Sequence, residues 1–292
     1  MSKKSFSEIY KEKNKPLILD GALGTYLEEK GFTPDEHLWF SYLNITKPKI
    51  VEQVHREYIE AGAEIITTNT FRTNPLAKKK SSIDISNNEL VKRSVQLVKN
   101  VVANENILIA GSNAPAEDCY QSERTVSKFD LEYNHKKHIE LLYENGVDLI
   151  WNETQSHLDE IEIISKFCFE NKIPFAMNLF FTNNFKILSG ESVKDIVEII
   201  SVYKPELIGF NCIKHDSLLS NIDKINLPDN WGFYFNCGGD FKDQKIVCSI
   251  TPNDYKIIVS NFIPYNPKFI GSCCGSNPDH IKEIKGFIDA LH

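Results

Sequence analysis

Short apolar runs alternate with longer amphipathic segments along almost the whole chain. The runs are rich in Ile, Leu and Phe and show little strict alternation of apolar and polar residues. Such a pattern is typical of parallel strands, because helices cover both faces of a parallel sheet. Eight runs occur, at residues 17–19, 64–68, 107–110, 149–151, 175–179, 207–210, 232–235 and 268–270.

The segments between the runs carry apolar residues at three- and four-residue steps, the spacing of one helix face, as at Ile50, Val54 and Tyr58. Eight strands alternating with eight helices predict an α/β fold, a (β/α)8 TIM barrel that forms a single domain over residues 1–292. A doubly wound open sheet is the alternative. A Rossmann cofactor site is disfavoured, because Gly21 and Gly24 lack the third glycine of the dinucleotide fingerprint.

Composition and charge narrow the class of protein. The chain is 41% hydrophobic and 25% charged, and no apolar stretch approaches the ~20 residues that span a bilayer. A net charge of -7 argues against nonspecific nucleic-acid binding. The N-terminus lacks the apolar core of a secretory signal, so a cytoplasmic location is expected. We therefore expect neither a membrane nor a nucleic acid as partner.

In a TIM barrel the active site lies at the carboxyl ends of the strands, so the polar residues that follow each run are candidates. Taken in order along the chain, they are Asp20 and Gly21; residues 68–71; 111–113; 152–155; 182–183; Asn211 and Cys212; 236–238; and Cys273 and Cys274.

Three cysteines stand out among these candidates. Cys212 ends the sixth run, and Cys273 and Cys274 follow the eighth, between Gly271 and Gly275, whose backbone freedom allows a bend. Three thiolates on zinc leave its fourth tetrahedral position open, as in catalytic sites. We predict that Cys212, Cys273 and Cys274 bind Zn²⁺; the alternative is ordinary core or surface cysteines.

The other cysteines and the histidines indicate no further site. Seven cysteines without regular spacing are expected to be reduced thiols, and Cys119, Cys168, Cys237 and Cys248 are each isolated in the sequence. No pair of histidines has metalloprotease spacing, so no histidine is nominated.

Asp20 and Glu153 place carboxylates at the mouths of the first and fourth strands. Asp20 stands too far before the first good helix to cap it, which favours a role in the site. Glu153 precedes a helix that begins near His157, so a cap or first-turn role is its alternative.

Seven segments together resemble the homocysteine S-methyltransferase family. They occur in the family's order, and the Asn-Cys and Cys-Cys-Gly segments are the most specific. The segments are residues 19–27 (LDGALGTYL), 67–71 (TTNTF), 111–115 (GSNAP), 153–155 (ETQ), 209–212 (GFNC), 236–239 (NCGG) and 271–275 (GSCCG).

The resemblance implies zinc-dependent methyl transfer to the sulfur of homocysteine, giving methionine. By matching position, Cys212, Cys273 and Cys274 would bind the zinc. Asp20 and Glu153 would bind the homocysteine ammonium group, and backbone amides around Gly21 and Ala22 would face its carboxylate. No further catalytic residue is implied, because coordination to zinc itself removes the thiol proton. The oligomeric state is left open.

Two departures from the family pattern concern the methyl donor. Residues 116–122 lack an expected glycine-rich stretch, and residues 236–239 read Asn-Cys-Gly-Gly where Asn-Ser-Gly is common. S-methylmethionine is the first candidate donor, then S-adenosylmethionine, with betaine as an alternative; aromatic rings attract such onium groups. Candidate rings are Trp39, Phe40, Tyr42 and Phe180, which could instead be core or lid residues. Rival functions are methylation of another thiol or a selenol, and a noncatalytic zinc-binding barrel.

Overall fold

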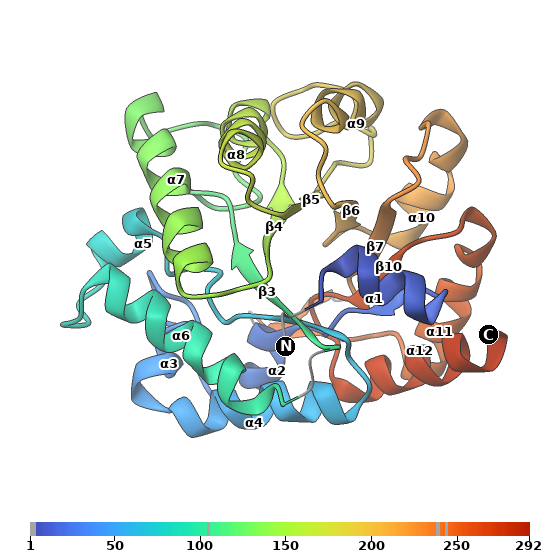
Figure 1. Cartoon of the computed structure of the whole chain (residues 1–292), viewed down its shortest axis with the longest axis horizontal. Coiled ribbons are helices and arrows are strands. Elements are labelled where there is room, and N and C mark those ends of the chain that lie inside the picture. The colour runs from blue at the N-terminus through green and yellow to red at the C-terminus, as the bar shows by residue number, and fades with distance from the viewer. Residues whose placement is uncertain (1–3, 104–105, 238–239, 243–244) are drawn as a thin grey trace.

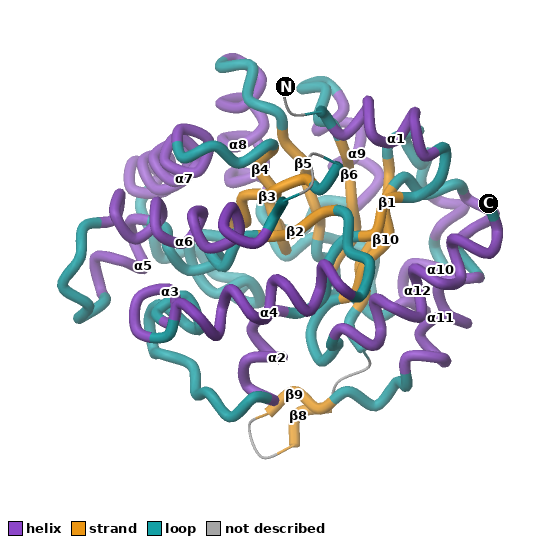
Figure 2. The backbone as a smooth tube through the Cα atoms, turned by 60° about the horizontal axis from the view of Figure 1, so that its bottom comes forward, coloured by secondary structure: helices purple, strands orange, loops and turns teal. Residues whose placement is uncertain are grey.

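Eight parallel strands close into a barrel in the computed structural model, which describes residues 4–103, 106–237, 240–242 and 245–292 (Figures 1 and 2). The strand order is β1-β10-β7-β6-β5-β4-β3-β2, and Leu19 pairs with Ile65 to join β1 to β2. Each predicted run coincides with one strand, so the TIM barrel is confirmed and the open sheet is wrong. The strands are β1 (Leu17–Ile18), β2 (Ile65–Thr67), β3 (Leu108–Asn113), β4 (Leu149–Gln155), β5 (Phe175–Leu179), β6 (Leu207–Asn211), β7 (Trp231–Phe235) and β10 (Phe269–Ser272).

Helices surround the barrel and follow the strands in turn (Figure 1). The outer helices are α4 (Pro48–Glu60), α6 (Asn87–Val101), α7 (Lys128–Glu144), α8 (Leu158–Glu170), α9 (Val193–Ser201), α10 (His215–Leu219), α11 (Pro252–Ser260) and α12 (Pro278–Leu291). The pattern did not predict the shorter elements α1 (Phe6–Lys13), α2 (Leu23–Glu29), α3 (Leu43–Thr46), α5 (Pro75–Lys80), η1 (Ile222–Lys224) and η2 (Ile263–Tyr265), or the hairpin of β8 (Asp240–Lys242) and β9 (Lys245–Val247).

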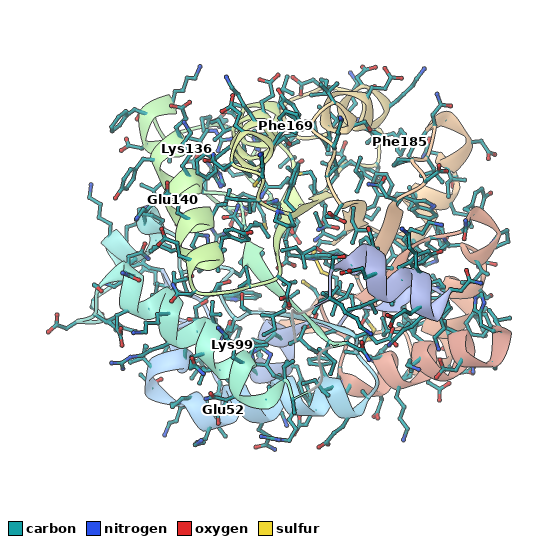
Figure 3. The ribbon with its side chains drawn as sticks, in the orientation of Figure 1. Glu52, Lys99, Lys136, Glu140, Phe169 and Phe185 are labelled. Carbon is teal, nitrogen blue, oxygen red and sulfur yellow. A yellow bond between two sulfur atoms is a disulfide. The ribbon has the colours of Figure 1, made fainter. Side chains whose placement is uncertain are left out.

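The strands divide the core into an inner and an outer layer. Leu17 and Leu19 pack inside the barrel with Trp151 and Phe269, whereas Ile18, between them, packs outward with the helices. This alternation follows from the pleat, which points successive side chains to opposite faces. Polar side chains predominate on the outer helix faces: Lys99 is exposed on α6, and Lys136 and Glu140 are partly exposed on α7 (Figure 3).

Helix α1 covers the end of the barrel where the strands begin. Its buried Phe6 and Ile9 join the inner layer, and Lys13 forms a 2.6 Å ion pair with Glu64, just before β2. The opposite end, where the strands finish, is therefore the open one. Across residues 4–103, 106–237, 240–242 and 245–292, no helix is long and apolar enough to cross a membrane.

A glycine inside the barrel gives a stability test of this packing. A Cβ at Gly232 of β7 would lie 2.5 Å from the carbonyl oxygen of Phe269, and backbone cannot easily move away. We expect Gly232→Ala to lower the free energy of unfolding by about 1–3 kcal/mol in urea denaturation. Gly286→Ala is the control, because an added Cβ meets nothing within 4 Å on α12. The free energy of unfolding of this control should rise by about 0.5–1 kcal/mol, because Ala has the higher helix propensity. Equal effects of the two changes would contradict the close packing of Gly232 against the Phe269 carbonyl.

Candidate active site

A cavity of about 420 Å³ opens at the carboxyl ends of the barrel strands. Its wall combines the ends of β1, β2, β3, β4, β6, β7 and β10 with the loops that follow β1, β2 and β3. All seven residues predicted for the site line it: Asp20, Gly21, Ala22, Glu153, Cys212, Cys273 and Cys274.

The three candidate metal ligands meet in this cavity. Their sulfur atoms all lie within 4.8 Å of one another, and the Sγ atoms of Cys273 and Cys274 are 3.9 Å apart. Cys212 and Cys273 are joined as a disulfide in this structure. Burial raises the pKa of the Cys274 thiol to about 11, so a nearby cation would be needed to hold it as a thiolate at neutral pH. Three soft sulfur donors facing an open cavity fit zinc.

The backbone at the end of β6 directs Cys212 toward the other two thiols. Cys212 has φ +53°, a conformation that few non-glycine residues adopt. Two hydrogen bonds hold it there: its N–H donates to the Tyr234 carbonyl at 3.3 Å, and the Asn236 amide donates to its carbonyl at 2.9 Å. The ligand position is therefore set by neighbouring β7 as well as by β6.

The turn that carries Cys273 and Cys274 is tied to the loop after β1. The Gly275 N–H donates to Thr25 Oγ1 at 2.9 Å, and the Ala22 N–H donates to Ser276 Oγ at 3.2 Å. Gly275 has φ +86°, so the backbone bends there as the sequence predicted. Because the Ala22 amide is already used by Ser276, the predicted role of this amide in carboxylate binding would require a rearrangement.

Glu153 faces the cavity from an irregular part of β4. The register of β4 shifts between Asn152 and Gln155, and Asn211, the neighbour of Cys212, accepts from the Thr154 N–H at 2.9 Å. Since α8 begins at Leu158, with His157 as its N-cap, Glu153 does not cap this helix.

Hydrogen bonds and burial set the protonation of Glu153. Ser112 Oγ donates to one carboxylate oxygen at 2.5 Å and the Tyr234 hydroxyl to the other at 3.3 Å. Burial nevertheless dominates and raises the pKa of Glu153 to about 7. A cationic group entering the cavity would favour the charged carboxylate.

Asp20 is buried beside the same cavity. Its carboxylate accepts from the Thr67 N–H at 2.8 Å and from the Thr67 hydroxyl at 3.0 Å. Burial raises the pKa of Asp20 well above its usual range, and the charge of Glu153 adds to this effect. Asp20 and Glu153 thus form an acidic pair of the kind that an ammonium group would stabilise.

Tyr234 is a site residue that the sequence prediction missed, and Ser112, one of the polar candidates after the third run, was given no role there. Tyr234 points inward from β7, one residue before the strand ends, and its hydroxyl also accepts from the Trp151 indole N–H at 3.1 Å. The signal was available, because alternation along β7 places Tyr234 inside while Phe233 and Phe235 face outward. The last inward position of a strand is therefore a second place to look for site residues, besides the positions that follow the strand.

The aromatic lining differs from the predicted set. Trp39 lines the cavity and packs on Phe71 with 5.5 Å between ring centroids, and Tyr120 lines it from another loop. Among the described residues, Phe40, Tyr42 and Phe180 do not line it. Phe40 is buried in the core, and the Tyr42 hydroxyl donates to Thr33. Phe180 packs edge-to-face against the ring of Tyr120, with ring centroids 5.1 Å apart.

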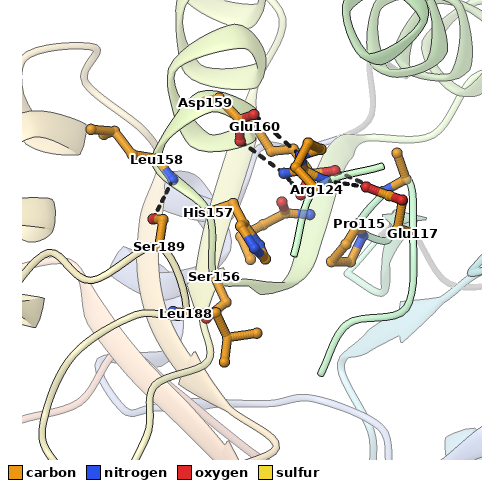
Figure 4. Close-up of polar contacts among 12 residues, drawn as sticks. Pro115, Glu117, Arg124, Ser156, His157, Leu158, Asp159, Glu160, Leu188 and Ser189 are labelled. Atoms are coloured by element: carbon orange, nitrogen blue, oxygen red, sulfur yellow. Dashed lines mark hydrogen bonds and ion pairs between the residues drawn. The ribbon is translucent and has the colours of Figure 1, made fainter. Parts of the chain in front are cut away.

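The segment that departs from the family pattern borders the cavity through residues 118–120. Arg124 anchors it to the start of α8, donating to Asp159 at 2.8 Å, Glu160 at 3.0 Å and Glu117 at 3.1 Å (Figure 4). Burial alone would raise the pKa of Glu160, yet a hydrogen bond from His135 and the charge of Arg124 lower it to about 2. This anchor fixes the loop without contributing to the cavity wall.

Several predicted polar positions serve the barrel instead of the site. Asn113 donates to Asn152 at 2.8 Å, and Asn152 donates to the Ala176 carbonyl at 2.9 Å, so these amides link neighbouring strands. Residues 182–183 and 236–237 do not line the cavity, within the part of the chain that is described. Gly238 and Gly239 lie outside the described residues.

The expectation of seven reduced, unconnected thiols is wrong for four of them. Besides Cys212 and Cys273, Cys237 and Cys248 are joined as a disulfide. Cys119, Cys168 and Cys274 are free. The strand ends predicted that Cys212 and Cys273, 61 residues apart, would meet, but nothing in the spacing predicted that Cys237 and Cys248, 11 residues apart, would be joined.

Comparison with known proteins decides the family. The family model described as homocysteine S-methyltransferase matches residues 17–288. This chain belongs to the homocysteine S-methyltransferase family. The homocysteine S-methyltransferase of Escherichia coli is 25% identical, over 94% of this chain and 96% of that protein. The selenocysteine Se-methyltransferase of Brassica oleracea is 23% identical, over 96% of this chain and 91% of that protein.

Solved structures of this family share the fold. The metallated form of the homocysteine methyltransferase MmuM from E. coli superimposes with a TM-score of 0.82, at 21% identity, over 97% of this chain and 99% of that one. Its oxidised form gives a TM-score of 0.81 over the same shares. Homocysteine S-methyltransferases are methyltransferases, so this chain is assigned to that class of enzyme.

Proposed function

We propose that this chain transfers a methyl group from a small sulfonium donor, S-methylmethionine first, to homocysteine, with Zn²⁺ held by Cys212, Cys273 and Cys274. The observation that carries the proposal is the convergence of three sulfur atoms within 4.8 Å in the cavity that Glu153 also lines. In the zinc-binding form the Cys212–Cys273 pair is reduced to two thiols, taking two electrons and two protons from a thiol reductant.

When bound, zinc would stabilise the homocysteine sulfur as a thiolate at neutral pH, where a free thiol is mostly protonated. Glu153 and Asp20 hold the ammonium end of homocysteine, and Ser112 and Tyr234 orient the Glu153 carboxylate. The sulfur of homocysteine then forms a bond to the donor methyl carbon as the bond from that carbon to the donor sulfur breaks. The donor leaves as a neutral thioether, so the step needs no proton transfer.

The cavity favours a small cationic donor. A volume of about 420 Å³ is near the lower end of the ~300–1,000 Å³ range of small-molecule sites, which suits two amino-acid-sized substrates better than an adenosyl group. Trp39, Phe71 and Tyr120 present aromatic rings to it, and such rings attract onium cations. The charge and size of the cavity thus support S-methylmethionine over S-adenosylmethionine.

A donor panel with reduced, zinc-loaded protein tests the proposal. Homocysteine is offered with S-methylmethionine, S-adenosylmethionine or betaine, and methionine is measured by mass spectrometry. We expect the highest rate with S-methylmethionine. Methionine from betaine alone would contradict the sulfonium donor, and binding of zinc and homocysteine without turnover on any donor would make the chain a noncatalytic barrel.

A selenol acceptor is a second candidate, because the relatives include selenocysteine methyltransferases. The three cysteine ligands would bind selenium as they bind sulfur, and the carboxylates would bind the same ammonium group. Competition between homocysteine and selenocysteine for one donor distinguishes the two acceptors, and a higher kcat/KM for selenocysteine would replace homocysteine as the proposed substrate.

A further inference from the structure

A second cluster of metal-ligating side chains lies behind the active site and does not line the cavity. Cys237 follows β7, Cys248 follows the hairpin of β8 and β9, and His280 lies in the first turn of α12. Their ligand atoms all lie within 4.8 Å of one another. The proposed methyl transfer uses none of the three.

Four potential ligand atoms in this cluster lie close to one another: two sulfurs, one imidazole nitrogen and one carbonyl oxygen. His280 Nε2 lies 3.1 Å from Cys237 Sγ and 3.6 Å from Cys248 Sγ. The Ile250 carbonyl oxygen lies 3.1 Å from His280 Nε2, and 3.2 Å and 3.0 Å from the sulfurs of Cys237 and Cys248. In the thiol form, two S–H groups would share this one carbonyl oxygen with the imidazole.

The imidazole of His280 is oriented from its far side. Its Nδ1 lies 3.0 Å from the side-chain oxygen of Asn277, the N-cap of α12. Nδ1 also accepts from the Asn277 backbone N–H at 3.3 Å, and in that tautomer the Nε2–H faces the Ile250 carbonyl oxygen. Metal binding requires the other tautomer, in which Nδ1–H donates to the Asn277 side-chain oxygen and Nε2 presents its lone pair to the two sulfurs. Metal-binding histidines are held in this manner, with the second nitrogen donating to an oxygen.

We propose that Cys237, Cys248 and His280 bind a second zinc ion when the two cysteines are reduced, with the Ile250 carbonyl oxygen at the fourth corner. Zinc bonds of about 2.0–2.3 Å place tetrahedral ligand atoms about 3.3–3.8 Å apart. The sulfur–nitrogen separations of 3.1 and 3.6 Å are close to this range, and so are the sulfur–oxygen separations of 3.0 and 3.2 Å. Reduction frees the sulfurs to separate to a similar distance.

Zinc can bind to Cys237 and Cys248 only after the bond between them is reduced. Reduction of the Cys237–Cys248 bond takes two electrons and two protons from a low-molecular-weight thiol reductant, which is oxidised to its own disulfide. Zinc binding then releases both thiol protons to solvent, because the thiolates are the ligands. The neutral imidazole and the carbonyl oxygen contribute lone pairs without any proton change.

The second zinc ion would stabilise the turn that carries Cys273 and Cys274. The Cys237 N–H donates to the Cys274 carbonyl at 3.0 Å, and a Cβ at Gly275 would lie 3.4 Å from both Cys237 and Cys248. The cluster therefore packs directly against the turn of Cys273 and Cys274 but shares no ligand with it. Its zinc would join β7, the residues after the hairpin and α12 at this point.

Metal counting on the full chain tests the proposal. Protein purified with a thiol reductant is stripped by a chelator, reloaded with Zn²⁺ and desalted, and zinc per chain is measured by mass spectrometry. We expect two ions per chain in the wild type and one in Cys248→Ser and in His280→Gln. Cys273→Ser should also retain one, from the second site, and Cys168→Ala, a buried free cysteine on α8, should retain two.

One ion per wild-type chain that is lost in Cys273→Ser and kept in Cys248→Ser would overturn the proposal, whether alkylation then finds Cys237 and Cys248 free or joined. Two ions in both Cys248→Ser and His280→Gln would overturn it equally. If the variants do not fold, the wild-type count decides, and thiolate-to-metal absorption of the cobalt-loaded Cys273→Ser protein reports whether sulfur ligands remain. The proposal does not rest on the methyltransferase reaction, so failure of the donor panel leaves it standing.

Discussion

Cys273→Ala is expected to abolish methyl transfer, lowering kcat/KM at least ~100-fold, and to remove one zinc ion per chain. The reason is that a metal site left with two thiolates holds zinc weakly and leaves the acceptor sulfur protonated. Methionine formation and zinc content are measured on the same reduced, zinc-loaded preparation. The expected loss concerns the chemistry of the site, because Cys273 lies at the cavity wall and not among the helices.

Cys168→Ala is the matched control for this change. Cys168 is a buried free cysteine on α8 and lines no part of the cavity, so its replacement should leave both zinc content and rate near those of the wild type. Full activity in Cys273→Ala would overturn the zinc mechanism. Loss of activity with unchanged zinc would instead show that Cys273 acts on the substrate without holding the metal.

Glu153→Gln is expected to raise the KM for homocysteine and to make the folded protein more stable at alkaline pH. Loss of a hydrogen bond to a charged group costs about 1.5–3 kcal/mol, which corresponds to a rise in KM of roughly 10- to 150-fold. The methyl-transfer step itself does not use this carboxylate, so kcat should change much less. Initial rates at varied homocysteine concentration separate the two constants.

The effect of Glu153→Gln on stability depends on pH with a definite sign. Burial raises the pKa of Glu153 from 4.5 to about 7, so the folded protein binds this proton more tightly than the unfolded chain does. The stabilising contribution is complete below about pH 4.5 and is lost as pH rises through about 7. Metal-free, reduced Glu153→Gln should therefore match the wild type near pH 4 and exceed its stability near pH 8.

The expected gain near pH 8 is about 2 kcal/mol, since part of the cost of the buried charge is screened by water in the cavity. Urea denaturation at the two pH values measures it. Glu162→Gln on the exposed face of α8 is the control and should change neither KM nor the pH dependence. A variant less stable than the wild type at pH 8 would contradict the raised pKa.

The positions of Glu153 and Tyr234 show how far residue pattern can predict a site. Glu153 was predictable because a barrel gathers strand ends at one face, and any polar residue there is a candidate. Tyr234 was not nominated because it lies within an apolar run, and the prediction considered residues after the runs. The same rule wrongly selected Asn113 and Asn152, whose amides bond to each other between strands.

For the aromatic residues, the sequence could not predict which side chains reach the cavity. Trp39, Phe40 and Tyr42 lie close together in one loop, and the sequence offers no period from which to assign their directions. Only Trp39 reaches the cavity, because the loop turns through its φ of +49° while Phe40 is buried in the core. Phe71 and Tyr120 come from two other loops, so their meeting depends on how those loops pack.

The sequence by itself determined the barrel and the meeting of Cys212 with Cys273 and Cys274. Both follow from local patterns, since apolar runs specify strands and parallel strands in a barrel end at one face. Only the tertiary structure decided that Cys237, Cys248 and His280 form a second cluster. Their contact depends on how a hairpin and α12 pack against the end of β7, and such packing between distant segments leaves no periodic signal in the chain.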